Sequence, residues 1–279
     1  MGVTTQMETN ETFPNNSVIV DEALEAVINF FRGRADLVDV IGRALRQSFD
    51  EVIDGPRTGR YRIEELEKTE KTYIGTKVEI ILRNELALSR GSVLDNLIAG
   101  HEVDTKFSLT GNWMIPREAV GQICLLVEGS DNAGIFSAGL LRMVPLVLTN
   151  GANQDGKKSV SAVGKASIHW LIRDEVLPPN FLLRLPDDVR SRIMSRSSGV
   201  QRVKELFVSV TDVIIPRTAI EQVARQKDPL KRARAMKAEL VADGFKILCA
   251  TYATDREEFR RNGFDEFQKD DWLSLRQAD

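Results

Sequence analysis

Apolar residues recur at helical spacing in the first part of the chain. Between residues 20 and 54 they form two stripes, which Gly33 separates. A period of three to four residues is typical of an amphipathic helix, so two helices are expected there. The Gly and Pro content of residues 54–60 predicts a loop. Residues 61–86 are expected to be mostly helical. Their expected core positions are Ile63, Leu66, Tyr73, Ile74, Val78 and Leu82.

The pattern changes to one that favours strands after residue 90. Residues 95–108 alternate around Ala99 and Gly100, which predicts a β-hairpin. Residues 123–127 and 135–148 are richly apolar and predict buried strands. A hairpin beside further strands, with helices before and after, indicates an α/β core.

A break in the pattern divides the chain into two domains. Residues 160–172 predict a helix that closes the first domain, and residues 173–180 contain adjacent prolines and mark the junction. After a loose polar lead-in over residues 1–17, the first domain is expected to span residues 18–177. The second domain is then expected to span residues 178–279.

The second domain has short helices and few strands. Helices are expected over residues 200–210, 216–226 and 229–243. Asp228 is expected to cap the third helix and Gly244 to end it. FKILCATY, from residue 245, then predicts a strand. Three helices and a strand fit a helix-turn-helix or winged-helix module.

The composition is that of a soluble globular protein. Of 279 residues 42% are hydrophobic and 28% charged. No run approaches the roughly 18 apolar residues of a membrane span, and the start lacks the features of a signal peptide. A cytoplasmic protein with no membrane partner is therefore expected. Two His and two Cys nearly exclude structural zinc and a disulfide scaffold, and Cys124 and Cys249 are expected to be buried, reduced thiols.

The net charge of −3 hides a strong segregation of charge. Taken alone it argues weakly against nucleic-acid binding. Residues 190–237, however, hold twelve basic and four acidic residues, a surplus of eight, so the remainder carries −11. In the third helix of this module, Lys231, Arg232 and Arg234 point away from the apolar face formed by Leu230, Ala233, Met236 and Leu240. Such a helix can enter a DNA groove or contact phosphates; the alternative is an ordinary solvated surface.

Four residues form a candidate catalytic cluster. Asp104 and Lys106 are two apart on one predicted strand, so both side chains project from the same face. Asp95 lies on the partner strand of the hairpin and Glu79 on the preceding helix. Phosphodiester hydrolysis needs such a set, because carboxylates hold Mg²⁺, which acidifies a bound water, and a lysine can orient that water or stabilise the developing charge. The alternative is a solvated acidic edge in which Lys106 simply pairs with one carboxylate.

Several blocks of sequence resemble the NaeI-type (type IIE) restriction endonucleases. These blocks are DGPRTGR, KTEKTYIGTKVEI, IAGHEVDTKFS and WMIPREAVGQICLL in the first domain, then NFLLRLPDDVRSRI and RVKELF in the second. Their order and spacing are far more specific than an Asp-x-Lys triplet. The resemblance implies a restriction-endonuclease-like α/β core, with a mixed sheet flanked by helices, and a mainly helical C-terminal domain similar to the winged-helix region of a catabolite activator.

The resemblance also implies roles for individual residues. The catalytic acids of the family fall on Glu79, Asp95 and Asp104, which would hold Mg²⁺, and its catalytic lysine falls on Lys106. Thr69 and Lys71 would lie near the scissile phosphate. With the basic residues of the second domain, the expected DNA-binding positions are Thr69, Lys71, Arg217, Lys231, Arg232, Arg234 and Lys237.

The function implied is that of a Mg²⁺-dependent, sequence-specific endonuclease that cuts both strands of double-stranded DNA. The family further implies a homodimer, a second DNA copy bound as effector, and no nucleotide cofactor. The chain departs from the family pattern around the hairpin and in an acidic stretch over residues 255–279, which leaves the target sequence and the need for a second site open. Two alternatives remain: a nicking endonuclease of the DNA-repair type, and a catalytically inactive winged-helix regulator.

Overall fold

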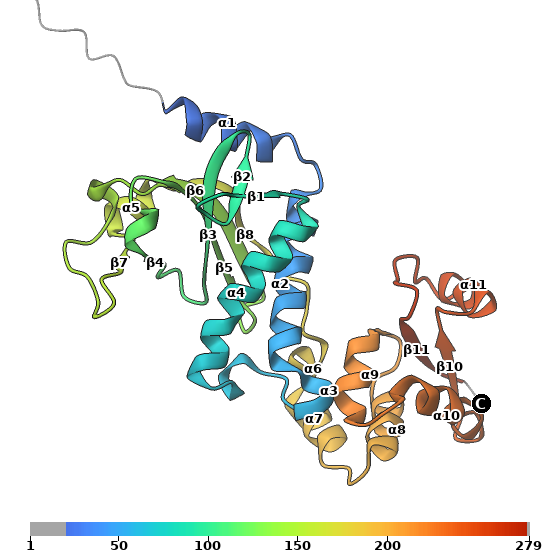
Figure 1. The fold of residues 1–279 in the computed structure, drawn as a ribbon. Coiled ribbons are helices and arrows are strands. Elements are labelled where there is room, and N and C mark those ends of the chain that lie inside the picture. Colours follow the sequence, from blue (N-terminus) through green and yellow to red (C-terminus); the bar gives the residue numbers. More distant parts are fainter. Residues whose placement is uncertain (1–20, 278–279) are drawn as a thin grey trace, which may run out of the picture.

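The structure is a computed structural model that describes residues 21–277. The lead-in expected over residues 1–17 lies outside this range. An N-terminal part, residues 21–177, contains a large sheet, and a C-terminal part, residues 178–277, contains short helices and a small sheet (Figure 1). No helix between residues 21 and 277 is long and apolar enough to cross a membrane.

The first two helices are confirmed, and both bury their apolar stripes. Helix α1 (Glu22–Arg32) is capped by Asp21, whose Oδ1 accepts a hydrogen bond from the N–H of Leu24 at 3.0 Å. Helix α2 (Leu37–Ile53) ends at Asp54 in the left-handed conformation. The loop expected next is partly wrong, because Gly55–Thr58 forms the one-turn helix α3.

Helix α4 (Lys68–Glu85) carries the predicted core positions but begins later than expected. It follows a short 3-10 helix, η1 (Ile63–Glu65), and its first turn is closed by a capping box between Glu67 and Glu70. The prediction for Tyr73 is wrong, because its side chain is 48% exposed. The helix turns Tyr73 to the solvent, where the ammonium of Lys77 lies over its ring.

Six strands form a mixed sheet in the order β1-β2-β3-β5-β6-β8. The strands are β1 (Ser89–Arg90), β2 (Asn96–Ile98), β3 (His101–Ser108), β5 (Ile123–Ser130), β6 (Ile135–Arg142) and β8 (His169–Val176). β3 and β5 are parallel and the other neighbours antiparallel. Helices α1, α2 and α4 share the larger core with one face of the sheet, and the other face packs against a smaller core around Trp113. This confirms the α/β core.

The predicted hairpin is confirmed as β2–β3. Asn96 pairs with Val103 and Ile98 with His101. The two turn residues, Ala99 (φ 50°) and Gly100 (φ 82°), both have positive φ, which is the requirement of the tight two-residue turn that matches strand twist. Asp95 directly precedes β2.

Two predictions after residue 135 are wrong. The strand expected over residues 135–148 ends at Arg142, and Pro145–Val147 forms the 3-10 helix η3. The helix expected over residues 160–172 is only α5 (Ala162–Ala166), after which the chain forms β8. β8 supplies hydrogen-bond partners to the outer edge of β6, and this tertiary pairing overrides the local helical pattern.

Short elements complete the N-terminal part and open the C-terminal part. On the sheet face around Trp113 lie β4 (Met114–Ile115), η2 (Arg117–Ala119) and β7 (Lys158–Ser159), of which β4 and β7 pair with each other. After β8 the chain leaves the sheet at Pro178 and forms α6 (Phe181–Arg184) and α7 (Asp187–Met194).

The three helices expected in the C-terminal part are confirmed. They are α8 (Gly199–Ser209), α9 (Arg217–Ala224) and α10 (Pro229–Ala242). The cap predicted at Asp228 is wrong: its backbone is left-handed and its side chain makes no capping hydrogen bond. Gly244, with φ at 81°, follows the end of α10 as predicted.

A three-stranded antiparallel sheet of order β10-β11-β9 completes the C-terminal part. β10 (Phe245–Cys249) is the predicted strand, whereas β9 (Ile214–Ile215) and β11 (Trp272–Arg276) were not expected. Helix α11 (Ala253–Arg261) lies between β10 and β11 in the sequence. The acidic stretch thus supplies most of α11 and all of β11, the central strand of this sheet.

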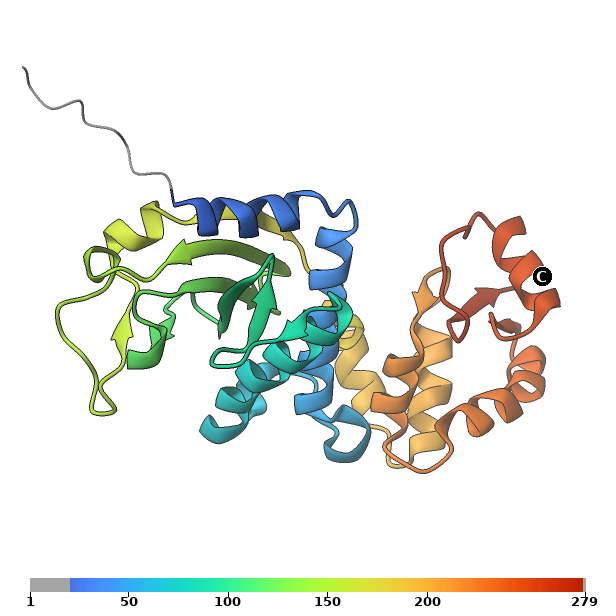
Figure 2. The ribbon, with the colours of Figure 1, turned by 45° about the horizontal axis from the view of Figure 1, so that its top comes forward.

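The two parts meet where α3 lies beside α9 (Figure 2). The side chain of Arg225 donates a hydrogen bond to the carbonyl of Gly59 at 2.8 Å. The amide of Asn180 donates to the carbonyl of Tyr61 at 2.7 Å and to Asp131 at 3.1 Å. The family-like block at residues 54–60 thus contacts the C-terminal helices.

Trp272 provides a test of the folded C-terminus. Its side chain is fully buried beside Phe207, so Trp272→Ala should lower the free energy of unfolding by about 3–5 kcal/mol. Leu146→Ala is the control, because Leu146 is 78% exposed, and it should change that energy by less than about 0.5 kcal/mol. Urea denaturation measures both. Equal stability of the Trp272 variant and the wild type would contradict the fold at β11.

Candidate active site

The β2–β3 hairpin brings two carboxyl groups and an ammonium together. Asp104 lies on β3 and is only 5% exposed, and Asp95 lies opposite it, within hydrogen-bonding reach of its carboxyl group. The Nζ of Lys106 lies 2.8 Å from Oδ2 of Asp104 and 4.0 Å from Oδ2 of Asp95. The predicted Asp95, Asp104 and Lys106 therefore form one cluster.

A hydrogen-bond network through Arg83, Asn96 and Thr105 holds Asp95 in place. The N–H of Thr105 donates to Oδ2 of Asp95 at 2.8 Å. Arg83 on α4 donates through Nε to the carbonyl of Asp95 at 3.1 Å and to Oδ1 of Asn96 at 3.0 Å. The amide of Asn96 in turn donates to Oγ1 of Thr105 at 2.9 Å, and both side chains are buried. The backbone of the opposite strand thus positions the carboxylate of Asp95, and Arg83 of α4 holds its main-chain carbonyl.

Glu79 approaches the cluster from α4, one helical turn before Arg83. Burial, followed by the charge of Asp95, raises the pKa of its carboxyl group to about 7, against a smaller opposing effect of Lys106. A carboxyl group with a pKa near neutrality can take up or release a proton under ordinary conditions. Glu79 is thus the third predicted acid that the structure brings to this place.

Burial also governs the charges of Asp104 and Lys106. Burial and the neighbouring Asp95 raise the pKa of the Asp104 carboxyl group to about 6, although Lys106 opposes the shift. For Lys106, burial lowers the pKa, but the ion pair with Asp104 and the other acids outweigh it and the net shift is upward. Lys106 is therefore a cation at neutral pH, which suits it to stabilise negative charge.

The side of the sheet behind the cluster is apolar. Cys124 of β5 is the neighbour of Asp104 across the parallel strands, and its thiol is fully buried. Burial raises the pKa of this thiol far above its ordinary value, so it stays protonated. Cys124 and Cys249 are both free and buried, as predicted.

The donor set at the hairpin fits Mg²⁺. Within residues 21–277 no three His, Cys, Asp or Glu side chains converge closely enough to hold one metal ion. Asp95 and Asp104 nevertheless provide two adjacent carboxyl groups, and Mg²⁺ is usually bound by one or two carboxylates together with water and substrate phosphates. Oδ2 of Asp104 is buried beside the ammonium of Lys106 at 2.8 Å, and a carboxylate oxygen has a second lone pair that can bind a cation.

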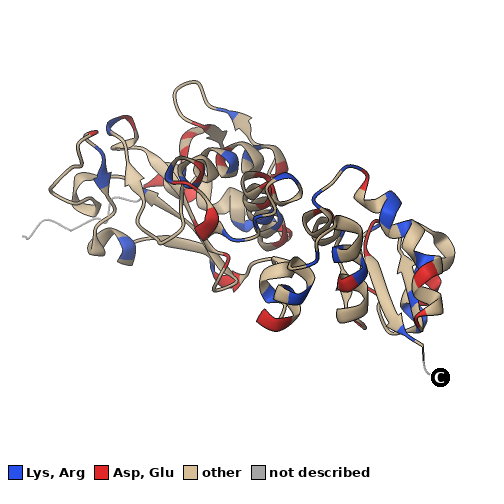
Figure 3. Ribbon diagram, turned by 90° about the horizontal axis from the view of Figure 1, so that it is seen from below, with Lys and Arg blue, Asp and Glu red and all other residues tan. Residues whose placement is uncertain are grey.

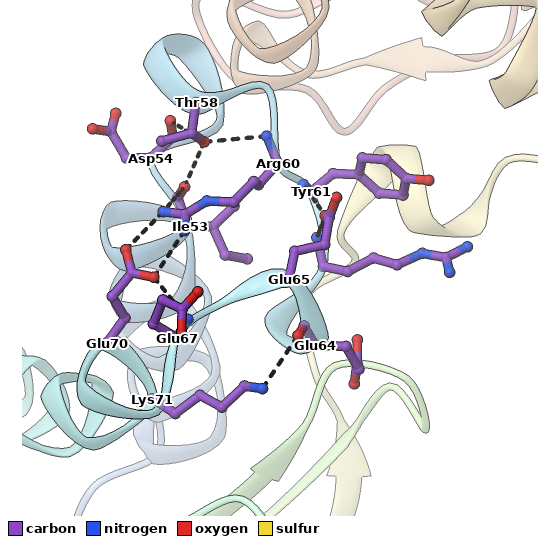
Figure 4. Close-up of polar contacts among 11 residues, drawn as sticks. Ile53, Asp54, Thr58, Arg60, Tyr61, Glu64, Glu65, Glu67, Glu70 and Lys71 are labelled. Atoms are coloured by element: carbon purple, nitrogen blue, oxygen red, sulfur yellow. Dashed lines mark hydrogen bonds and ion pairs between the residues drawn. The ribbon is translucent and has the colours of Figure 1, made fainter.

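Hydrogen bonds tie the start of α4 to the segment that precedes it (Figure 4). Arg60, from the family-like block, donates two hydrogen bonds of 2.8 Å to Glu70. Thr69 is exposed in the first turn of the helix, and Nζ of Lys71 donates to the carbonyl of Glu64 at 3.2 Å. The structure therefore places Thr69 and Lys71 on the cluster-bearing helix, two to three turns before Glu79.

The predicted DNA-binding residues of the C-terminal part differ in their surroundings. Lys231, Arg232 and Arg234 are exposed on α10 and form no ion pair with any described residue. Lys237 pairs with Asp255 at 2.5 Å and lies over two aromatic rings, and Arg217 pairs with Glu221 and Asp270. Lys and Arg positions are spread along these helices, with acidic positions among them (Figure 3).

Arg83, Asn96 and Thr105 contact Asp95 and were not predicted. One signal was present in the sequence: Arg83 follows Glu79 by four residues and so shares its side of a helix. The contributions of Asn96 and Thr105 depend on strand register, which the hydrophobic pattern does not state directly.

A mixed sheet flanked by helices, with acids and a lysine on a hairpin, is consistent with the core of a nuclease. The sequence model of the family "Restriction endonuclease NaeI" matches residues 33–279. The chain therefore belongs to the NaeI restriction endonuclease family. It is also 42% identical over 198 residues to the type II restriction enzyme NaeI of Lentzea aerocolonigenes. That match covers 68% of this chain and 62% of the relative, which is less than two thirds of the relative's length.

The raised pKa of Glu79 predicts a stability effect. Since the folded state holds its proton up to about pH 7 and the ordinary value is 4.5, stability should fall as pH rises through that window. Glu79→Gln, measured in EDTA at pH 8, should therefore be more stable than the wild type by about 1–2 kcal/mol after allowance for partial exposure.

The advantage of Glu79→Gln should shrink towards pH 5, where the wild-type carboxyl group is protonated. Glu85→Gln, at an exposed position of the same helix, is the control and should stay within about 0.5 kcal/mol at both values. Denaturant unfolding at each pH measures the differences. A Glu79→Gln variant that is less stable than the wild type at pH 8 would show that the carboxylate is not destabilised by its surroundings.

Proposed function

We propose that this chain is a Mg²⁺-dependent, sequence-specific type II restriction endonuclease that hydrolyses both strands of double-stranded DNA. The observation that carries the proposal is the cluster of Asp95, Asp104 and Lys106 on one hairpin, with Glu79 beside it, in a member of the NaeI family. The 42% identical relative, named a type II restriction enzyme, supports it.

Each residue of the cluster has a proposed task. Asp95 and Asp104 would hold Mg²⁺, and Glu79 would complete the acidic set by binding the ion or one of its waters. When bound, Mg²⁺ would supply a water of lowered pKa and positive charge to offset that of the phosphate. Lys106, as an ammonium, orients the attacking water and stabilises the negative charge that develops on phosphate oxygens. Glu79 is suited to move a proton near neutral pH, because its pKa is about 7.

The C-terminal part is proposed to be a winged-helix DNA-binding domain. α9 and α10 are consecutive helices joined by a turn of four residues, 225–228, as in a helix-turn-helix. Residues early in the second helix of that motif contact base edges in the major groove, and Lys231, Arg232 and Arg234 lie in the first half of α10. β9 and β10 both pair antiparallel with β11, and this small sheet supports the assignment as a winged helix, in which a short antiparallel sheet forms the wing.

Further proposals follow from family membership. We propose an endonuclease domain over residues 18–177 and a DNA-binding domain over residues 178–279. The partners are two DNA copies, substrate and effector, and a second chain in a homodimer that cuts both strands. Thr69 and Lys71 are proposed to contact DNA near the scissile phosphate, and Arg217 and Lys237 to contribute to the basic surface of the C-terminal domain.

The proposed catalytic roles predict separation of cleavage from binding. Asp104→Ala and Lys106→Ala should each reduce Mg²⁺-dependent cleavage of plasmid DNA at least 100-fold, since each removes a group needed in the transition state. DNA affinity should remain within about threefold of the wild type. Initial cleavage rates and a binding isotherm in Ca²⁺ measure the two effects. Undiminished cutting by either purified variant would refute the assignment.

The product from supercoiled plasmid distinguishes the alternatives. Linear DNA indicates a two-strand cutter, persistent open circles indicate a nicking repair-type enzyme, and binding without cleavage in Mg²⁺ or Mn²⁺ indicates an inactive regulator. Sequencing of the fragment ends would identify the target.

The basic side of α10 yields a second prediction. Replacing Lys231, Arg232 and Arg234 with Gln should weaken DNA binding and reduce its salt dependence, because each lost phosphate contact lowers the slope of log affinity against log salt by about 0.9. The matched control replaces Arg256, Arg260 and Arg261 of α11 with Gln and should leave both quantities near wild type. Equal salt slopes for the α10 variant and the wild type would place the DNA elsewhere.

A further inference from the structure

Gly75 lies in the interior of α4 without a packing reason. A Cβ atom built at this position meets no other atom within 4 Å, so neither a close neighbour nor a positive φ requires glycine. Glycine in a helix interior is less favourable than alanine because the unfolded chain has more freedom to lose. The structure thus contains an unfavourable residue that its own packing does not explain.

Gly75 shares one stripe of α4 with Glu79. Lys68, Thr72, Gly75 and Glu79 are spaced at intervals of three or four residues, which places them on one side of the helix. Gly75 precedes Glu79 by four residues, about 6 Å along the axis. That length corresponds to about two steps of 3.4 Å along a DNA strand.

A groove runs along this stripe between α4 and the end of β3. Its volume is about 320 Å³, and it is lined by Lys68, Lys71, Thr72, Gly75 and residues 107–109. Glu79 follows Gly75 by four residues on α4, and Lys106 directly precedes Phe107 on β3, so each wall of the groove belongs to an element that also carries a residue of the cluster. Gly75 is one of its lining residues, and a Cβ atom there would lie in open space.

The charge of the groove favours an anion. Lys68 and Lys71 form no ion pair with a described residue, and the hydroxyl of Thr72 adds a polar group. Lysines near the start of a helix are disfavoured by the helix dipole, and the one hydrogen bond that either ammonium makes, from Lys71 to the carbonyl of Glu64, leaves both positive charges unneutralised by described residues. A polyanion that passes through the groove towards Glu79 would account for the lysines and for the missing side chain.

We infer that Gly75 is a DNA-contact position, kept without a side chain so that the sugar-phosphate backbone next to the scissile phosphate can lie against α4 between Lys68 and Glu79. The inference rests on the proposed function and deepens it. Gly75 takes no part in the chemistry. Its missing side chain leaves room for the DNA strand in the groove, and Lys68 and Lys71 neutralise the phosphates of that DNA strand.

The test uses variants that should raise stability while they reduce binding. Gly75→Ala and Gly75→Gln both introduce better helix formers, so both should raise the Tm of the full chain. Gly75→Gln should also fill the groove and weaken binding at least tenfold for a labelled duplex carrying the mapped cleavage site, measured in Ca²⁺. Gly75→Ala, with only a methyl group, should weaken it two- to fivefold.

Two comparisons exclude a general effect on the helix. Asn84→Ala and Asn84→Gln make matched changes at an exposed position of α4 and should leave DNA affinity unchanged. Lys68→Ala combined with Lys71→Ala should lower the slope of log DNA affinity against log salt by about two. Gly75→Gln should lower this slope similarly, because its side chain keeps the DNA strand away from both lysines.

The outcomes separate the inference from the proposed function. If Gly75→Gln binds DNA with an affinity within twofold of the wild type, whatever its Tm, the inference is overturned. Cleavage of DNA by the wild type would in that case leave the proposed function intact. A wild-type chain that neither binds nor cuts DNA would overturn both. A rise in Tm with a loss of affinity in Gly75→Ala supports the inference, because a purely structural role would move both in the same direction.

Discussion

The site depends on the register of one antiparallel pairing, β2 with β3. Because Asn96 lies opposite Val103, Asp95 lies opposite Asp104, and the N–H of Thr105 can bind the Asp95 carboxylate at 2.8 Å. A shift of one residue would turn every side chain of the strand to the other face and separate the two acids. The tight turn at Ala99 and Gly100 and the buried Asn96–Thr105 hydrogen bond fix this register.

The register also creates an electrostatic cost. It holds Asp95, Asp104 and Glu79 around a single ammonium in a partly desolvated place, so the pKa values of Asp104 and Glu79 rise to about 6 and about 7. Such perturbation is typical of functional sites. A divalent cation would offset the repulsion among these carboxylates. The geometry thus supports the Mg²⁺ dependence proposed for this chain and gives a reason for this electrostatically unfavourable set of charges.

Predictions from the sequence are correct for the elements that local patterns determine. They are wrong for the segments whose secondary structure depends on tertiary contacts. The α1, α2 and α4 helices and the β2–β3 hairpin follow from hydrophobic period and turn chemistry, as does the cluster of Glu79, Asp95, Asp104 and Lys106. The local pattern predicts a helix over residues 160–172, but residues from His169 onward form β8, because they pair with β6. β11 was overlooked within a charged stretch, although Trp272 is buried there. The contact of Arg83 with Asp95 and the groove at Gly75 both depend on the packing of α4 against β3, which local sequence patterns do not determine.

Asp95 and Asp104 are proposed to hold a hard divalent cation together. A calorimetric titration of the full chain with Mn²⁺ at pH 8 tests this proposal most directly, because it needs neither a known target sequence nor cleavage. We expect the wild type to bind Mn²⁺, and Asp95→Asn and Asp104→Asn to bind it at least tenfold more weakly. Equal Mn²⁺ affinity of the wild type and both variants would contradict this proposal.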